Sequence, residues 1–396
     1  MAEGWPTLSD DQRLAWLRLI RTPRIGPALF QDLLNLYGSA QGAIDALPHM
    51  SARRGVRFQP ADADAIEREM VDAAKLGARF LVCGEPGYPP VLTHTPRPPP
   101  ILCALMKSAE VSAKPTVALV GARNASAGGL ALAKRMATDL GKAGVTVVSG
   151  LARGVDAAAH LGSVETGTLA FTAGGLARPY PPEHSDLMAR IADTGGAVYS
   201  EMPLTWVARA QDFPKRNRLV AGSSLGVVIV EAAKRSGSLI TARQAGELGR
   251  LVMAVPGFPL DPRSDGPNSL IRDGATLVTN ADDVLEEIGP LLSQPAKWEP
   301  PSVQSQSSGD QLPLLREDKE LRAEYEPVDA EGQQAIEQAM GFSPITADVL
   351  IESTGLPTAQ VRVWLVENEL VGRIVRSAGD RFAWSPEKAG DNYASP

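Results

Sequence analysis

Cysteine is scarce in this chain: only Cys83 and Cys103 occur among its 396 residues. Neither lies in a Cys-x-x-Cys pair or next to paired histidines, so the sequence offers no disulfide framework and no zinc site. We expect both to be small buried hydrophobes in a reducing compartment. The four histidines are scattered along the chain without metal-ligand spacing. We therefore expect neither a metal nor an organic cofactor.

Long apolar runs are also missing. The N-terminus reads Met-Ala-Glu-Gly-Trp-Pro and has no basic segment followed by an apolar core, so it does not resemble a signal peptide. No early run approaches the ~18 apolar residues of a membrane-spanning helix. The sequence predicts a cytoplasmic protein without a membrane span. With 44% hydrophobic residues it can bury a large core, and its length suggests two or three domains.

Common signatures of nucleotide enzymes are absent as well. No Gly-x-x-x-x-Gly-Lys-Ser/Thr occurs, and the loop after Val120 lacks Gly-x-Gly-x-x-Gly. A P-loop ATPase is thereby excluded and NAD binding is poorly supported. Asp156 and Glu231 follow predicted strands and are candidate acid or base groups, but carboxylates beside an N–H-rich turn are more often caps or ion-pair partners. We expect no catalytic residues and no enzyme activity.

Residues 79–288 alternate continuously apolar runs with helical stretches. The runs are Thr116–Val120, Val145–Val148, Thr168–Thr172, Ala197–Ser200, Gly226–Val230, Leu251–Val255 and Ala275–Val278. Strands that are apolar on both faces are typical of a parallel sheet covered by helices. The sequence predicts an α/β fold with an extended Rossmann-like, doubly wound, mostly parallel sheet. Seven prolines within 84–100 predict an extended connector that excludes helix.

The two ends of the chain predict smaller domains. Residues 1–78 read as helical, and a Gly-Pro turn at Gly26 opens an apolar helix, typical of a helix-hairpin-helix or of a plain helical bundle. Residues 289–328 are rich in Pro, Ser, Gln and Glu and predict a disordered linker. Residues 329–385 predict three helices and a two-stranded hairpin, a winged-helix pattern, followed by a tail at 386–396.

Small residues, serines and cations follow nearly every predicted strand. The carboxyl ends of parallel strands share one edge of the sheet, where ligands bind in such folds. The loops at this edge carry Arg123, Arg153, Lys234 and Arg235. One such loop is commonly only a packing device, whereas four together favour a rim that accepts phosphates on backbone N–H groups and cations.

Charge is distributed unevenly. The chain carries −7 overall, yet residues 209–250 contain eight Lys or Arg and three Asp or Glu. Within this stretch Phe213 stands among Lys215, Arg216 and Arg218, which predicts a strip for phosphates with a ring on which a base can stack. Alternatively, Phe213 is a core residue and Arg216 or Arg218 is an ion-pair partner.

The predicted winged helix has the opposite balance. Residues 330–384 contain four Arg and seven Asp or Glu, and the predicted recognition helix carries only Arg362. A winged helix that reads duplex DNA needs a basic recognition helix. The pattern favours a protein partner or an accessory role.

Eight motifs, in this order, resemble the DNA-processing protein A family (DprA, also called Smf). They are Val120–Ser126, Ser149–Asp156, Tyr180–Glu183, Ser200–Pro203, Phe213–Arg218, Glu231–Thr241, Val255–Gly257, and Pro267–Ile271 with Gly274-Ala275. The resemblance implies an extended Rossmann fold that binds single-stranded DNA and forms a homodimer, a sterile-alpha-motif-like domain before it and a winged helix after it. It also implies that the protein protects incoming strands in natural transformation and helps to load the RecA recombinase.

Carried over residue by residue, the resemblance together with the rim cations predicts one DNA-binding set. Its members are Gly121, Arg123, Ser126, Arg153, Phe213, Lys215, Arg216, Asn217, Arg218, Ser236, Gly237 and Ser238. Two other functions stay open. One is a nucleotide N-glycosidase of the lysine-decarboxylase-like Rossmann type, although this chain lacks that type's Pro-Gly-Gly-x-Gly-Thr before Glu231. The other is a transcription regulator that acts through the winged helix.

Overall fold

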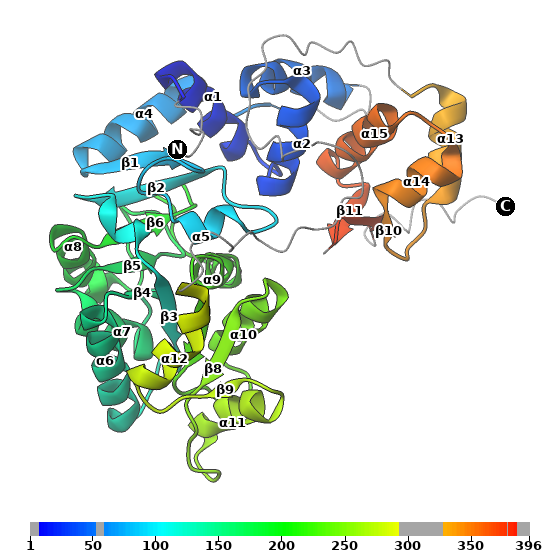
Figure 1. The fold of residues 1–396 in the computed structure, drawn as a ribbon. Coiled ribbons are helices and arrows are strands. Elements are labelled where there is room, and N and C mark those ends of the chain that lie inside the picture. The colour runs from blue at the N-terminus through cyan, green and yellow to red at the C-terminus, as the bar shows by residue number, and fades with distance from the viewer. Residues whose placement is uncertain (1–7, 53–58, 293–327, 378, 386–396) are drawn as a thin grey trace. The chain divides into compact units, whose positions relative to one another are not determined.

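The computed structural model describes residues 8–52, 59–292, 328–377 and 379–385 (Figure 1). The described residues divide into two compact units: one contains residues 67–292, and the other contains the described residues of 8–66 and of 328–385. The predicted tail and all but the ends of the predicted linker lie outside the described residues. No helix among the described residues is long and apolar enough to cross a membrane.

A nine-stranded sheet forms the first unit, in the order β1-β2-β6-β5-β4-β3-β7-β8-β9. Seven strands run parallel: β3 (Thr116–Val120), β4 (Thr146–Ser149), β5 (Thr168–Phe171), β6 (Ala197–Ser200), β7 (Gly226–Ile229), β8 (Leu251–Ala254) and β9 (Thr276–Leu277). Two antiparallel strands, β1 (Ala78–Val82) and β2 (Ile101–Met106), complete one edge. The predicted doubly wound, mostly parallel fold is confirmed, and the antiparallel edge was not predicted.

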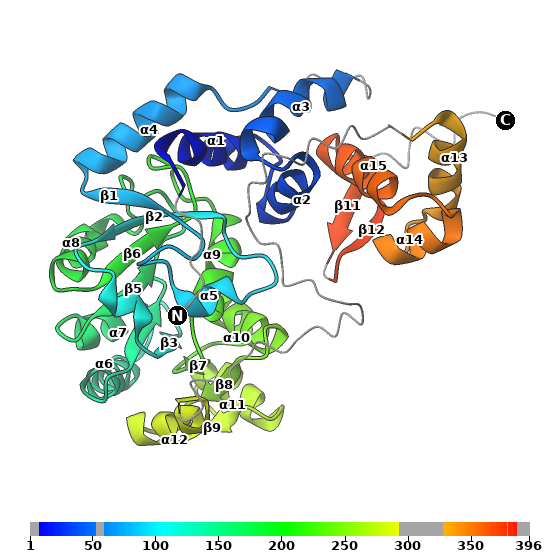
Figure 2. The ribbon, with the colours of Figure 1, turned by 45° about the horizontal axis from the view of Figure 1, so that its top comes forward.

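Helices cover both faces of this sheet (Figure 1, Figure 2). They are α6 (Ala127–Lys142), α7 (Val155–Ser163), α8 (Ser185–Asp193), α9 (Asp212–Gly222), α10 (Gly237–Glu247), α11 (Asp265–Arg272) and α12 (Ala281–Leu292). One buried cluster lies between the sheet and α6, α7 and α12, while α9 and α10 pack against each other. Because the central strands are buried on both faces, their sequences are apolar without alternation.

Strand β3 is the point at which the winding of the sheet reverses. β4, β5 and β6 follow on one side of it and β7, β8 and β9 on the other. In open α/β sheets the loops diverge at such a point and leave a crevice beyond the carboxyl ends of the strands. The topology therefore places the candidate site beyond β3, β4 and β7.

The proline-rich stretch contains one helical turn, α5 (Pro90–Thr93). Pro90 is its first residue, a position at which a helix uses no N–H group and at which the fixed φ of proline is already helical. The prediction that these prolines exclude helix was therefore wrong at this turn.

The second unit combines the helical N-terminal segment with the winged helix. Its elements are α1 (Asp10–Arg21), α2 (Pro27–Tyr37), α3 (Ala40–Ala52), α13 (Ala330–Ala339), α14 (Ala347–Thr354), α15 (Thr358–Leu370), β10 (Ile345–Thr346), β11 (Ile374–Ser377) and β12 (Arg381–Trp384), and α4 (Ala63–Lys75) begins in it. β10 adds a third strand to the two-stranded hairpin that the sequence predicted.

The predicted recognition helix, α15, is buried on more than one side. Val361, Trp364 and Leu365 enter the winged-helix core, and α2 and α3 also pack against the helix. Every residue from 363 to 368 is buried. A helix that reads a DNA groove must expose one face, so this stretch of α15 is not available to a groove.

His160 of α7 is a buried neutral histidine. Its Nδ1 lies 2.9 Å from Thr168 Oγ1, and that hydroxyl donates its own hydrogen to the carbonyl of Val147 at 2.7 Å. The hydroxyl can therefore only accept from His160, which fixes the tautomer with hydrogen on Nδ1. Burial, together with the charges of His184 and Arg216, lowers the pKa of His160 to about 3.

We expect His160 to make the fold sensitive to mild acid. The unfolded imidazole takes up a proton below its ordinary pKa of 6.5, whereas the folded one stays neutral down to about pH 3. This contribution to stability is complete above pH 6.5 and is lost as the pH falls, at ~1.4 kcal/mol per pH unit. Denaturant unfolding of the wild type and His160→Gln at several pH values between about 7.5 and 4.5 measures it. The variant should show a flatter decline, and two parallel profiles would contradict the assignment.

Candidate nucleic-acid interface

An open cavity of about 870 Å³ lies beyond the carboxyl ends of β3, β4 and β7. Eight of the twelve predicted site residues line it: Gly121, Arg123, Phe213, Arg216, Asn217, Ser236, Gly237 and Ser238. The other four, which are Ser126, Arg153, Lys215 and Arg218, do not. The structure therefore brings most of the predicted set together, across three loops and the first turns of α9 and α10.

Glycines at this rim serve two different purposes. A Cβ at Gly121 would lie 2.7 Å from Val155, and one at Gly150 would collide with the guanidinium of Arg216. These two glycines are required because the loops approach their neighbours closely. A Cβ at Gly237 would meet nothing within 4 Å. Packing does not require a glycine there, and the first turn of α10 stays open toward the cavity.

Phe213 is a half-buried cavity residue rather than a core residue. The Cζ atom of Arg123 lies 4.8 Å from its ring centroid and that of Arg216 lies 6.0 Å away. The ring of Tyr180 meets it edge to face, with centroids 5.4 Å apart and planes at 72°. The cavity thus combines two aromatic rings with guanidinium groups, the side chains that contact bases and phosphates in single-strand binding.

Arg216 lines the cavity but is only 5% exposed. Its Nη1 donates to the carbonyl of Gly150 and, at 3.0 Å, to that of Phe171. Burial lowers the pKa of Arg216 to about 10, so it remains a cation at neutral pH. Burial also raises the pKa of Asp156, and the guanidinium of Arg216 opposes that rise. Arg216 was considered either as a phosphate-binding residue or as a structural partner of other groups in the protein. Its burial and its contacts favour the structural role.

Three other predicted cations have acidic partners. Arg218 forms a partly buried ion pair with Glu201. Arg153 Nε lies 2.5 Å from Glu183 Oε1, and this hydrogen bond raises the pKa of Arg153. The exposed ammonium of Lys215 is 3.8 Å from the buried carboxylate of Asp212, a looser contact.

Arg123 and Arg235 are the two exposed arginines that line the cavity. Arg235 belongs to the predicted rim but not to the predicted DNA-binding set, so the set lacked a cavity residue. Its position in the loop after β7 was the available signal, since the carboxyl ends of parallel strands share this edge. Tyr180 was missed as well, although its motif was among the eight that carried the resemblance.

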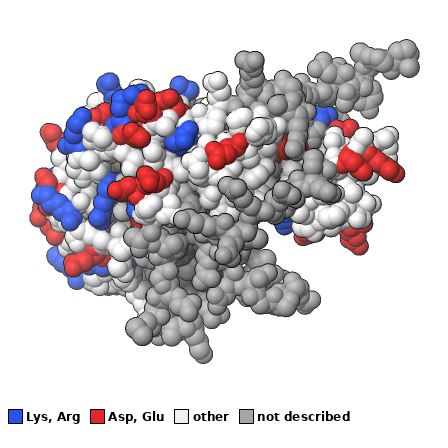
Figure 3. Space-filling view, turned by 90° about the horizontal axis from the view of Figure 1, so that it is seen from above, with Lys and Arg blue, Asp and Glu red and all other residues white. Residues whose placement is uncertain are grey.

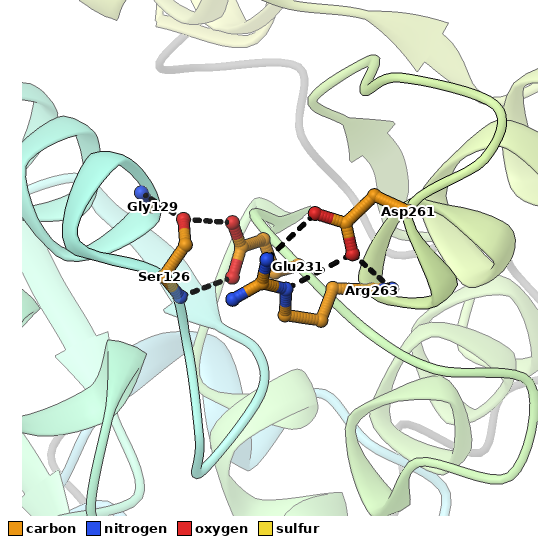
Figure 4. A network of polar contacts seen from close by, with 5 residues as sticks. All are labelled: Ser126, Gly129, Glu231, Asp261 and Arg263. Atoms are coloured by element: carbon orange, nitrogen blue, oxygen red, sulfur yellow. Dashed lines mark hydrogen bonds and ion pairs between the residues drawn. The ribbon is translucent and has the colours of Figure 1, made fainter.

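Glu231 fills the N-terminus of α6 (Figure 4). Its carboxylate accepts the Ser126 N–H at 2.8 Å and the Ser126 hydroxyl at 2.6 Å, while Ser126 Oγ accepts the Gly129 N–H at 2.9 Å. Asp261 and Arg263 form a second pair close by, at 2.7 Å. Dinucleotide-binding folds hold a pyrophosphate at the equivalent helix N-terminus. Here an internal carboxylate occupies that position, and Ser126 is engaged with it.

The N-terminus of α10 has the opposite character. Ser236 caps it, its Oγ lying 2.7 Å from that of Ser238, and no acidic residue stands in the first turn. Asn217 of α9 donates to the carbonyl of Gly237 at 3.2 Å and links the two helices. The positive end of the helix dipole is therefore available to an anion in the cavity.

Elsewhere the surface carries mixed charge. Figure 3 shows a face on which basic and acidic side chains are interspersed. Exposed pairs such as Lys107 with Asp193 and Arg190 with Glu165 are typical of a solvated surface and contribute little to stability.

Three family models match the chain. A model described as DNA recombination-mediator protein A matches residues 79–289. A DprA-like N-terminal HHH domain matches residues 10–72, and a DprA winged helix domain matches residues 321–380. These matches confirm the resemblance that the eight motifs carried.

Individual proteins agree with the models. Protein Smf of Escherichia coli (strain K12) is 33% identical over 375 residues, 92% of this chain and 94% of that protein. DNA processing protein DprA of Bacillus subtilis (strain 168) is 37% identical over 203 residues, 51% of this chain and 68% of that protein. The structure of DNA processing protein A from Streptococcus pneumoniae matches with a TM-score of 0.58 and 27% identity, covering 71% of this chain and 99% of that one.

Adjacent glycines allow the Glu231 contact to be tested. A Cβ at Gly129 would lie 2.6 Å from the Glu231 carboxylate, whereas one at Gly128 would meet only Ser126 Oγ at 3.7 Å. Gly129→Ala should lower the free energy of unfolding by about 1–3 kcal/mol. Gly128→Ala, the matched control in the same helical turn, should be neutral or stabilising by less than ~1 kcal/mol. Denaturant titration measures both, and equal midpoints would show that Glu231 is not held as described.

Proposed function

Because the chain belongs to the DNA recombination-mediator protein A family, we propose that it binds single-stranded DNA in the cavity beyond β3, β4 and β7. The observation that carries this proposal is one shared surface: the exposed Arg123 and Arg235, the open N-terminus of α10 and the rings of Phe213 and Tyr180. Cations and N–H groups hold phosphates, and aromatic rings hold bases.

The proposed mechanism is capture of the sugar-phosphate backbone with the base sequence left unread. Phosphates lie against the first turn of α10 and the guanidinium groups of Arg123 and Arg235, with Lys215 at the margin. Stacking and phosphate contacts accept any base, so binding tolerates different sequences and weakens steeply with salt. In the cytoplasm the bound strand from natural transformation is protected and then passed to the RecA recombinase, in keeping with the family's description as a recombination mediator.

The proposed function includes no covalent step. Glu231, the carboxylate that an N-glycosidase needs, accepts two hydrogen bonds from Ser126. Asp156 is buried and its carboxylate accepts the Ala152 N–H at 3.3 Å. Both groups have structural partners, which supports binding over hydrolysis of nucleotides.

We expect the salt dependence of DNA binding to identify the cavity. Fluorescence anisotropy of a labelled oligo-dT should show tight binding at low salt, with log K falling linearly with log salt at ~0.7 per phosphate contact. An Arg123→Ala/Lys215→Ala variant should lose roughly 10- to 100-fold in affinity and ~1.4 from the slope. The matched control is Lys107→Ala/Arg190→Ala, which removes two exposed cations outside the cavity. Full binding of the wild type near 1 M salt, or equal losses in both variants, would refute the proposal.

We propose further that two copies associate through the first unit, at the β9 end of its sheet. Among the described residues, β9 pairs with β8 alone. The exposed Leu277 lies on β9, and the exposed Phe258 and Leu260 lie in the loop that follows β8. Apolar side chains beside an unpaired strand edge favour association. Sedimentation velocity should show a dimer for the wild type and a shift toward monomer for Leu277→Arg, while Leu161→Arg, a control at an exposed leucine of α7, should leave the dimer intact.

A further inference from the structure

The Tyr180–Glu183 motif has no role in the binding surface predicted from the sequence, yet Tyr180 lines the cavity. Its side chain is 42% exposed, although tyrosine is large and partly apolar. The ring stands almost perpendicular to that of Phe213 and meets it at the edge. Two rings at this angle form a corner of the cavity, and we refer to the rings of Phe213 and Tyr180 as its two walls.

The two walls differ in what covers them. Guanidinium groups of Arg123 and Arg216 lie over the ring of Phe213, 4.8 Å and 6.0 Å from its centroid. Cation–π contacts of this kind occupy the face that a base needs for stacking. Among the described residues no guanidinium or ammonium group is found over the ring of Tyr180. Tyr180 therefore presents the more accessible aromatic face in the cavity.

Two contacts fix the Tyr180 segment to the loop after β4. Glu183 pairs with Arg153 at 2.5 Å, and His184 Nδ1 lies 2.9 Å from the carbonyl of Leu151. Leu151 is buried and has a positive φ of 55°, a conformation that surrounding structure must maintain in a non-glycine residue. The segment that follows Tyr180 is thus tied to the loop after β4.

From this geometry we infer that Tyr180 is the principal base-stacking residue of the cavity and that Arg153 is a positioning residue for it. The inference rests on the proposed binding of single-stranded DNA and deepens it. A base enters the corner and stacks on the ring of Tyr180, while Phe213 and Arg123 remain in contact with each other. Arg153 acts through Glu183 and touches no phosphate.

Substitutions at Tyr180 separate stacking from hydrogen bonding. Tyr180→Phe keeps the ring and should bind oligo-dT as the wild type does. Tyr180→Leu keeps a similar apolar volume without the ring and should lose about 5- to 100-fold in affinity. Photocrosslinking with an oligonucleotide that carries 5-iododeoxyuridine should attach the base to the peptide containing Tyr180. A wild type that binds no DNA would refute the proposed function itself. DNA binding unaffected by Tyr180→Leu, or a crosslink at Phe213 alone, would refute only this inference.

A charge exchange tests the role of Arg153. Glu183→Gln should lower affinity and reduce the crosslink at Tyr180, because the anchoring pair is broken. The exchanged pair Arg153→Glu/Glu183→Arg should restore both, since it rebuilds the contact with the charges reversed. If Arg153 instead bound a phosphate, the exchange would leave a carboxylate at that position and the loss would remain. Circular dichroism melting of each variant shows whether the fold is retained, and the crosslink yield reports the position of Tyr180 independently of affinity.

Discussion

The buried guanidinium of Arg216 is the interaction on which the cavity depends. It comes from α9 on one face of the sheet and donates to main-chain carbonyls at the ends of two strands, those of Gly150 and Phe171. Removing it would leave those carbonyls without this donor and the buried Asp156 without the cation that opposes the rise in its pKa, a costly combination in a region of low dielectric constant. The loop after β4, the end of β5 and the start of α9 are therefore held as one piece. Phe213 and Lys215 belong to the start of α9 and therefore stand on that piece.

Two helices begin at the rim, and their N-termini are used differently. Glu231 occupies the start of α6 through Ser126, so the position that holds a dinucleotide's pyrophosphate in related folds is satisfied from within. The start of α10 has a serine cap and no acidic neighbour in its first turn. The helix end that remains open is therefore that of α10, which lies beside α9, the helix that carries Phe213 and Lys215.

Much of this arrangement could be predicted from the sequence, because the relevant forces are local. Strands buried on both faces are apolar throughout, and glycine follows a strand where the chain must turn tightly, so the parallel sheet and its rim were both predictable. Whether each cation has an acidic partner could not be predicted. Arg123 and Arg153 look equivalent in the sequence, but Glu183, thirty residues away, pairs with Arg153, and only the folded chain brings those two side chains together. The partner of Arg218, Glu201, could not be predicted for the same reason. The antiparallel strands β1 and β2 escaped prediction because they flank a proline-rich stretch and pair across it.

The acidic residues of the winged helix also form ion pairs within the protein. Arg376 is only 6% exposed, with Asp32 of α2 and Glu369 within 2.7 Å and Asp380 at 3.1 Å, and Arg373 pairs with Glu337. Two of the domain's four arginines are therefore neutralised within the second unit. Residues 363–368 of α15 are buried as well, so no exposed helix face is left for a DNA groove along that stretch. In the first unit, by contrast, Arg123 and Arg235 line the cavity without such partners among the described residues.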